Sequence, residues 1–463
     1  MIRLFDSVHG EVRDLELRDP GCVSIYSCGP TVDNVPHIGH GRQTLVWDVV
    51  RRWLVFRGFD VRFVSNITDI DDKIIARALT ESTSVPEVVA KYEDEWWTAM
   101  TALGAAMPDE TPHATNYVSD MIELIVALLE RDDAYITSDG VYFDVTCIDD
   151  YGLLAGQPLE SLRAGARVET IEEKRSPLDF ALWKLAKPGE PSWPAPFGDG
   201  RPGWHTECVV MALDLLGDDF DLHTGGLDLK FPHHENERAQ AVAAHRPFAR
   251  HWAHHGWVMV NGEKMSTSLN NFTSLKDLLA KTDARAYRLL VLRSHYRSPI
   301  EVTPTTTADA QRALARLDSL ARRFDLPALA GETLEVASDF LWEGVGQDLF
   351  DAVAAALDDD MNTPLAVALL FDALAAANTA ADEGNDDEAR ALADAVNTLF
   401  SAMGLALNSH GGDVDVTSGQ LVAQRDAARA AKDWAQADRL RDELVTLGWV
   451  VEDSERGTVI RRP

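Results

Sequence analysis

The sequence predicts an α/β fold whose amino-terminal half is built on a parallel sheet and whose later part is helical. Three observations predict it. Residues 22–65 read as strand, helix and strand, residues 275–408 carry Ala/Leu/Asp/Arg-rich helical patterns, and the segment NSHGGDVDVTSG separates a last unit of about 45 residues. A chain of 463 residues exceeds what one hydrophobic core usually organises, so we expect several domains.

The first strand is predicted in CVSIYSCGPTV, which is rich in β-branched and aromatic residues. The apolar-periodic stretch GRQTLVWDVVRRWLVFRG predicts a helix that Gly58 ends, and DVRFVSNITDIDDKII predicts a strand running into a turn and a helix. Such a unit is typical of a nucleotide-binding sheet. Neither a GxGxxG fingerprint nor a Walker A lysine loop is present, so a dinucleotide or P-loop site is not indicated.

The middle of the chain reads as an insertion followed by a second α/β stretch. The insertion ends in LWKLAKPGEPSWPAPFGDGRPGWHTEC, whose Pro, Gly and Trp content suits a structured loop beside a site. The last unit combines a helical pair, LVAQRDAARAAKDWAQADRLRDELVTLG, with a small hairpin, WVVEDSERGTVIRR.

Composition narrows the function classes. A net charge of -32 argues against sequence-blind adhesion to nucleic acid, so a nucleic-acid partner would need a local basic patch. A salt-rich cytoplasm and a GC-rich genome both explain this acidity. The four cysteines form no CxxC pair or disulfide framework. We find no run of about 18 apolar residues and no signal-peptide pattern, and we expect a cytoplasmic protein without a membrane partner.

The stretch FPHHENE contains a candidate ligand pair. His233 and Glu237 are four apart and share one face of a helix, whereas His234 and Glu235 point elsewhere. The pair is either part of a metal site or an ordinary ion pair on a helix surface. Further ligands are needed to decide between the two.

Two further motifs indicate anion and nucleotide binding. In PHIGHGR, His37 and His40 begin a helix just after the first strand, where unpaired backbone N–H groups favour anions, and Gly39 lets a flat base lie against the backbone. In GEKMSTSLNN, Lys264 is placed to reach a phosphate.

In this order the two motifs resemble the HIGH and KMSKS signatures of class I aminoacyl-tRNA synthetases. The wider match is to the cysteinyl-tRNA synthetase family: YSCGPTV, HIGH, NITDIDDKI, PGWHTEC, GGLDLKFPHHENE and EKMSTS occur in the family's order. The resemblance implies a Rossmann-like catalytic domain in residues 1–95 and 196–270, a connective insertion in 96–195, a stem-contact region in 271–310, a helical bundle for the tRNA anticodon arm in 311–408, and a small α+β anticodon-recognition unit in 418–463.

By the same resemblance one Zn²⁺ per chain would be held by Cys28, Cys208, His233 and Glu237. Two thiolates, an imidazole and a carboxylate suit this metal. Zinc would select cysteine over serine, because a bound thiol becomes a strong thiolate ligand and a hydroxyl does not. We therefore expect no editing domain.

The resemblance also assigns roles in the reaction. The protein would activate L-cysteine with ATP and Mg²⁺ and would transfer the cysteinyl group to tRNA(Cys), as a monomer. Catalytic residues would be His37, His40 and Lys264; ATP-binding residues Gly39, Lys264 and Thr267; cysteine-binding residues Gly29, Thr68, Trp204, Asp228 and His223; tRNA-binding residues Arg425, Arg429, Lys432, Arg439 and Arg441, with Arg461 and Arg462 near the end.

One position departs from the family pattern. Thr267 stands where the family usually has the second lysine of KMSKS, so the loop lacks one positive charge for the departing pyrophosphate. Two other functions stay open. One is a cysteine ligase that uses a small amine acceptor, although such paralogues tend to lack the terminal unit. The other is a non-catalytic tRNA-binding relative, against which the intact motifs argue.

Overall fold

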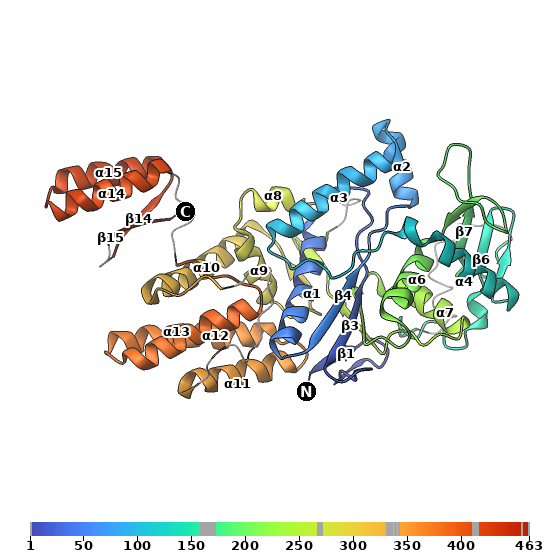
Figure 1. Cartoon of the computed structure of the whole chain (residues 1–463), viewed down its shortest axis with the longest axis horizontal. Coiled ribbons are helices and arrows are strands. Elements are labelled where there is room, and N and C mark those ends of the chain that lie inside the picture. Colours follow the sequence, from blue (N-terminus) through green and yellow to red (C-terminus); the bar gives the residue numbers. More distant parts are fainter. Residues whose placement is uncertain are drawn as a thin grey trace.

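The computed structural model of the chain describes residues 2–157, 173–265, 272–329, 337, 340, 343–409, 416–454 and 457–461. Its centre is a parallel sheet with the strand order β10-β9-β3-β4 (Figure 1). The strands are β3 (Cys22–Ser27), β4 (Asp60–Ser65), β9 (Leu222–Gly226) and β10 (His251–His255). Helix α1 (Ile38–Phe56) connects β3 to β4, which confirms the predicted strand-helix-strand unit.

Different helices cover the two faces of this sheet. Val23 and Ile25 share a core with α1 and α9 (Ala284–Leu292), whereas Tyr26 and Cys28 share one with α6 (Trp204–Leu216) and α7 (Glu235–Ala243). The alternation follows from successive strand side chains pointing to opposite faces. Ligand sites of such sheets lie at the carboxyl ends of the strands, where Cys28 follows β3.

The insertion forms a second, antiparallel sheet with the order β5-β6-β7-β8. Its strands are β5 (Ala134–Ile136), β6 (Gly140–Phe143), β7 (Phe180–Leu185) and β8 (Gly200–Pro202), and α4 (Val118–Glu130) packs on it. Helices α2 (Asp72–Glu81) and α3 (Val85–Ala102) follow β4 in the chain, and α3 packs against α1 and α8 (Leu275–Leu279). The domain boundary expected between 95 and 96 falls inside α3.

Short elements complete the part of the chain that contains the central sheet. They are strands β1 (Arg3–Asp6), β2 (Glu11–Asp14), β11 (Val258–Val260), β12 (Glu263–Lys264) and β13 (Ile300–Glu301), the 3-10 turns η1 (Ala114–Tyr117) and η2 (Val145–Cys147), a π turn η3 (Lys230–His234), and α8 (Leu275–Leu279).

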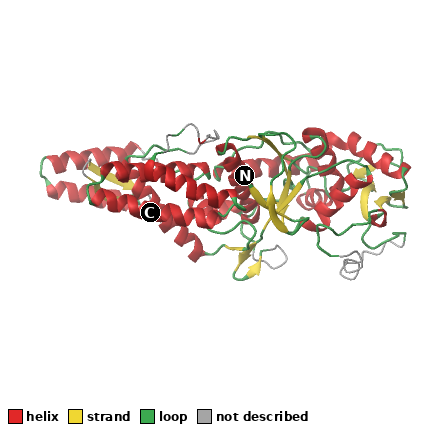
Figure 2. Cartoon of the chain, turned by 90° about the horizontal axis from the view of Figure 1, so that it is seen from below, coloured by secondary structure: helices red, strands yellow, loops and turns green. Residues whose placement is uncertain are grey.

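Helices extend away from the sheet on the side opposite the insertion (Figure 2). They are α10 (Pro304–Phe324), α11 (Gly344–Asp358), α12 (Thr363–Asp382) and α13 (Asp386–Ala402), which confirms the predicted helical region. The boundary expected between 310 and 311 falls inside α10. Among the described helices, α12 alone is long and apolar enough to cross a membrane, with a mean hydropathy of 1.5. It packs against α11 and α13, as a core helix of a helical bundle does.

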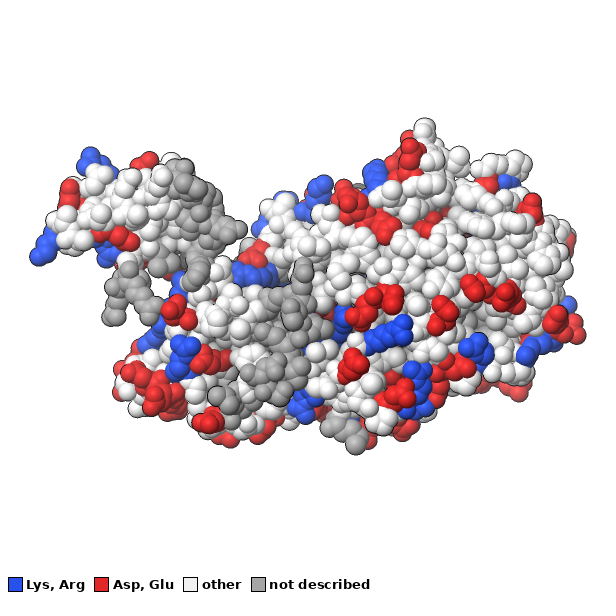
Figure 3. All heavy atoms as spheres, in the orientation of Figure 1, with Lys and Arg blue, Asp and Glu red and all other residues white. Residues whose placement is uncertain are grey.

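The last unit has its own small core. Helices α14 (Val416–Ala430) and α15 (Trp434–Thr446) pack on an antiparallel hairpin of β14 (Val450–Ser454) and β15 (Gly457–Arg461), as predicted. The unit stands apart from the bundle in Figure 1, and Arg322 of α10 reaches Glu452 of β14 at 3.6 Å. Basic and acidic side chains are interspersed on the face drawn in Figure 3.

Candidate active site and metal centre

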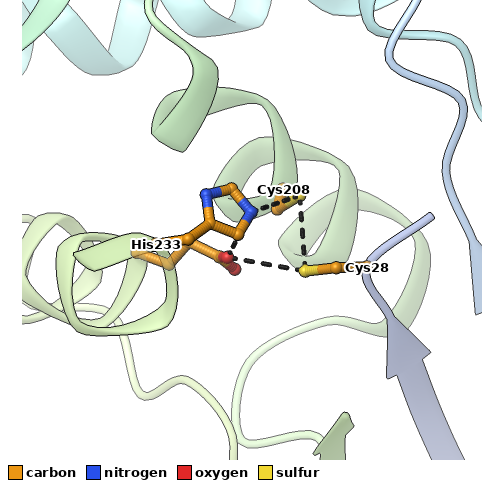
Figure 4. Close-up of side chains that lie close together, drawn as sticks. Cys28, Cys208 and His233 are labelled. Carbon is orange, nitrogen blue, oxygen red and sulfur yellow. Dashed lines mark hydrogen bonds and ion pairs between the residues drawn. The ribbon is translucent and has the colours of Figure 1, made fainter. Parts of the chain in front are cut away.

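The four residues expected to bind metal converge at the carboxyl end of the central sheet (Figure 4). Cys28 follows β3, Cys208 lies in α6, and His233 and Glu237 lie on either side of the start of α7. Their candidate ligand atoms all lie within 4.8 Å of one another. Each of the four residues is at most 3% exposed.

The spacing of His233 and Glu237 suggested one continuous α-helix, but the structure does not place the pair on one. His233 belongs to the π turn η3, in which Phe231 has an extended backbone, and Glu237 belongs to the first turn of α7. This junction still brings His233 Nε2 to 3.0 Å from Glu237 Oε1 and 3.6 Å from Cys208 Sγ. Cys28 Sγ lies 3.8 Å from Cys208 Sγ and 3.6 Å from Glu237 Oε1.

Further histidines hold the candidate ligands in place. His205 Nδ1 lies 2.8 Å from His233 Nδ1, so Nε2 is the His233 atom that faces the cluster. His223 Nε2 lies 2.7 Å from Glu237 Oε2. Hydrogen bonds of this kind fix the tautomer and orientation of metal ligands. The sequence predicted neither contact, because His205 and His223 lie on different elements from their partners.

A second group of candidate ligands overlaps the first. Cys28, His223, His234 and Glu237 also lie within 4.8 Å of one another, with His234 Nε2 at 3.3 Å from Cys28 Sγ. The expectation that the His234 side chain points away from the cluster is therefore wrong. Glu235 does point elsewhere: it accepts a hydrogen bond of 2.8 Å from the Leu154 amide.

The charges of the cluster favour a buried cation. Burial alone would raise the pKa of both Cys208 and Glu237, but hydrogen bonds from Cys28 and His233 lower the pKa of Cys208 to about 6. The charges of His223 and His233 hold the pKa of Glu237 well below its usual range. Burial opposes charge on His233, yet Glu237 raises its pKa to about 10, so a proton there compensates the anionic ligands. A dication could replace that proton.

A cavity of about 800 Å³ adjoins this cluster. Gly29 and Trp204 line it on the cluster side: Gly29 follows Cys28, and the Trp204 ring stacks on His233 with centroids 4.0 Å apart. Gly29 is required because a Cβ there would lie 1.7 Å from the Asn66 carbonyl oxygen. Asp228 lines the same cavity with a side chain that is 64% exposed.

Two residues predicted for cysteine binding are buried. The Thr68 hydroxyl donates to Glu207 Oε2 at 2.7 Å, and the other carboxyl oxygen of Glu207 has no hydrogen-bond partner among the described residues. The prediction placed His223 in the cysteine pocket. In the structure it is fully buried behind Glu237, stacked on Trp252 at 4.5 Å, and does not line the cavity.

His37 and His40 both line the cavity at the start of α1, where His37 is the helix cap. Each Nδ1 accepts a backbone N–H from the other residue, at 3.2 and 3.3 Å, so in the neutral rings Nε2 carries the proton. Burial lowers the pKa of His37 to about 4, and it also lowers the pKa of His40 well below its usual value. Both are therefore neutral N–H donors at pH 7. Gly39 lines the cavity between them.

Lys264 lines the cavity from β12, with its Nζ 3.8 Å from Asp228 and 4.7 Å from the centre of the Trp257 ring. Thr267 lies outside the described residues.

Two of the basic residues predicted to bind tRNA in the last unit form ion pairs. Arg425 is 3% exposed and donates to Asp453 at 2.6 Å, so it is not placed to touch tRNA as expected. Arg429 pairs with the same carboxylate at 2.7 Å. Lys432, Arg439 and Arg441 are exposed. The side chain of Arg461 and all of Arg462 lie outside the described residues.

Comparisons with known proteins agree with this arrangement. The family of tRNA synthetases class I (C) catalytic domains matches residues 15–312, the DALR domain matches 352–408, and the cysteinyl-tRNA ligase anticodon binding domain matches 413–461. A solved structure of Mycobacterium tuberculosis methionyl-tRNA synthetase in complex with methionyl-adenylate has a TM-score of 0.61 at 15% identity, covering 82% of this chain and 89% of that chain. The fold and cavity thus define a class I aminoacyl-tRNA synthetase.

Similarity to named proteins identifies the family within this class. The chain is 44% identical to a cysteine–tRNA ligase of Alkalilimnicola ehrlichii and 42% identical to one of Laribacter hongkongensis, over 100% of both chains in each case. The chain belongs to the cysteine–tRNA ligase family, and the predicted resemblance, fold class and enzyme class are confirmed. The two other functions considered from the sequence are not favoured.

Proposed function

We propose that the protein activates L-cysteine with ATP and transfers the cysteinyl group to tRNA(Cys), and that Cys28, Cys208, His233 and Glu237 hold one Zn²⁺ that selects the thiol. The buried four-ligand cluster beside a nucleotide-sized cavity carries the proposal. Its donor set fits zinc, and His205 and His223 orient two of the ligands. A zinc ion bound there would take the substrate sulfur as a thiolate, a ligand that serine cannot supply.

The chain's own groups would position the reactants. A carboxylate oxygen of cysteine forms a bond to the α-phosphorus of ATP, the bond from that phosphorus to its bridging oxygen breaks, and pyrophosphate leaves with the electron pair. His37 and His40 line the cavity with Nδ1 engaged by backbone N–H groups, and their Nε2–H groups would donate to phosphate oxygens that gain charge in the transition state. Mg²⁺ would accompany ATP, held mainly by the phosphates.

Several residues would hold the amino acid. Trp204 covers His233 and would close the pocket over the substrate side chain. Thr68, which is 2% exposed and does not line the cavity, would support the cysteine pocket from behind through its hydrogen bond to Glu207. Asp228 would contact the amino acid or the adenylate from the opposite wall. A terminal ribose hydroxyl of tRNA(Cys) would then attack the carbonyl carbon of the adenylate, and AMP would leave with the electron pair of the bond between that carbon and the phosphate oxygen.

We further propose that the protein works as a monomer in the cytoplasm. In this assignment the helices from α10 to α13 and the last unit bind the anticodon arm, and Lys432, Arg439 and Arg441 remain candidates for phosphate contacts because they are exposed.

The test is cysteine-dependent ATP/pyrophosphate exchange on the purified protein, with serine as competitor and zinc quantified in the same sample. Exchange with cysteine alone and about one zinc per chain supports the proposal. Charging of tRNA(Cys), compared with transfer to small amines, then separates the ligase from an amine-using paralogue. Zinc without exchange would contradict the activity.

The pH profile tests the state of the histidines. Because the pKa of His37 is lowered to about 4 and that of His40 lies well below its usual value, both stay neutral as pH falls from about 8 to 6. We expect the exchange rate at saturating substrates to show no inflection near pH 6.5 from these rings. An inflection there that His37→Asn removes would contradict the assigned protonation state.

Restoring the usual lysine tests the signature loop. Thr267→Lys adds a positive charge where pyrophosphate is expected to leave, so adenylate formation should be unchanged or faster by up to about tenfold, or about 1.4 kcal/mol. Single-turnover adenylate formation measures it, with Ser268→Lys as a neighbouring control. A large loss in Thr267→Lys would show that threonine belongs to a different loop geometry.

A further inference from the structure

Helix α2 places two cations in the wall of the active-site cavity. Lys73 and Arg77 are four residues apart, share one face of α2, and line the same cavity as His37, His40 and Lys264. Lys73 lies in the NITDIDDKI segment and Arg77 one turn beyond it, and neither was among the residues predicted to bind ATP.

Arg77 is held in place by its surroundings. Its Nε donates to the Asp33 carbonyl at 2.9 Å, its guanidinium lies over the Tyr92 ring at 5.7 Å, and Glu81 lies 3.9 Å from its Nη1. Its side chain is 29% exposed. Arg77 therefore forms a fixed positive point at the cavity wall.

Lys73 is different, because its side chain is exposed and forms no ion pair within 4.0 Å in the part of the chain that the structure describes. The adjacent Asp72 is already paired with Lys184 and Arg201. Asp33 feels the charges of Lys73 and Arg77, but its burial raises its pKa. A lysine without a carboxylate partner beside a cavity is available to a bound anion.

The position of Lys73 relative to His40 suggests which anion. Both residues line the cavity, and burial and the charges of His37 and Lys73 lower the pKa of His40, one of the two rings that the proposed function assigns to the phosphates. Across the cavity, Lys264 lies beside Asp228, which offsets part of its charge. The sequence offers no second lysine in the KMSTS loop, where Thr267 stands.

We infer that Lys73, backed by Arg77, binds the β- and γ-phosphates of ATP and the pyrophosphate that leaves. The inference rests on the proposed function. When the bond between the α-phosphorus and its bridging oxygen breaks, the electron pair moves onto pyrophosphate, and Lys73 stabilises this charge from the α2 side of the cavity. Lys73 thereby supplies a positive charge that the KMSTS loop lacks at Thr267.

The experiment compares Lys73→Ala, Lys73→Gln and Lys73→Arg with the control Lys91→Ala. Lys91 is a half-exposed lysine of the neighbouring helix α3, bound to Glu81 at 2.8 Å, and does not line the cavity. The measurements are single-turnover adenylate formation and exchange at varied pyrophosphate, with zinc content and the circular dichroism melting curve as folding controls.

We expect Lys73→Ala and Lys73→Gln to slow adenylate formation by about 10- to 100-fold and to raise the KM for pyrophosphate, with the KM for cysteine and the zinc content unchanged. Lys73→Arg should retain most activity, and Lys91→Ala should stay within about twofold of the wild type. Because Lys73 is exposed, all of these variants should fold.

Two results would overturn the inference while the proposed function stands. The first is wild-type exchange by both Lys73→Ala and Lys73→Gln. The second is unchanged exchange with slowed transfer of cysteine to tRNA, which would assign Lys73 to the terminal phosphate of the tRNA. Absence of cysteine-dependent exchange in the wild type would instead overturn the proposed function and this inference with it.

Discussion

Replacing Cys208 by serine is expected to remove most of the bound zinc and to abolish cysteine-dependent exchange. Cys208 is 1% exposed, and its sulfur faces Cys28 and His233. A serine hydroxyl in that position is a poor zinc ligand because it stays protonated. Losing a hydrogen bond to a metal ligand lowers metal affinity by about 10- to 100-fold, so we expect losing the ligand itself to lower zinc affinity by more than about 100-fold.

The measurement is zinc per chain after dialysis, together with exchange in the presence of cysteine or serine. Cys22→Ser is the matched control, because Cys22 begins β3, the strand that Cys28 follows, and is exposed. It should keep about one zinc and full activity. The circular dichroism spectrum of Cys208→Ser checks that the fold is retained.

The overlapping second group of ligands makes this experiment more specific. Cys208 and His233 occur only in the first group, and His223 and His234 only in the second. If the first group binds the metal, His234→Asn should keep most of the zinc while Cys208→Ser loses it. The reverse pattern would place the metal with His223 and His234 and would contradict the proposed ligand set.

The sequence predicted the parts of the site that single motifs determine. The strand before Cys28 and the helix after His37 follow from hydrophobic periodicity and from the glycine and proline residues between them. The grouping of Cys28 with Cys208 came from family resemblance, since residues 180 positions apart in the sequence give no local signal of contact. The packing of α6, which carries Cys208, against β3 brings the two thiols together.

The contacts that periodicity could not predict are those between side chains of separate elements. His205 meets His233 because a π turn, with an extended Phe231, replaces the regular helix that the spacing suggested. Arg425 was expected on the tRNA surface because family resemblance assigns the last unit to tRNA and Arg425 is one of several basic residues on its helices. It is buried because Asp453, on the hairpin, lies against α14.

Removing the carboxylate of Asp48 is expected to cost about 3–5 kcal/mol of folding stability. Asp48 lies in α1, is 5% exposed, and accepts hydrogen bonds from Arg52 at 3.0 Å and from Arg288 at 2.6 Å. Asp48→Ala leaves two buried guanidinium groups without their anion. Arg288 also donates to the Met403 carbonyl at 3.3 Å, so the cluster joins α1 and α9 to the end of α13.

Urea unfolding followed by far-ultraviolet circular dichroism measures this cost as a lower midpoint. Asp309→Ala is the control, because its ion pair with Arg312 is exposed and should contribute less than about 1 kcal/mol.

Burial opposes charge on Asp48, but Arg288 and Arg52 lower its pKa. A carboxyl with a lowered folded pKa stabilises the protein above its unfolded pKa and loses this contribution as pH falls through the folded value. The difference in urea midpoint between wild type and Asp48→Ala should therefore be largest at pH 7 and become smaller only in strongly acidic solution. Equal midpoints at pH 7 would contradict a stabilising role for this buried cluster.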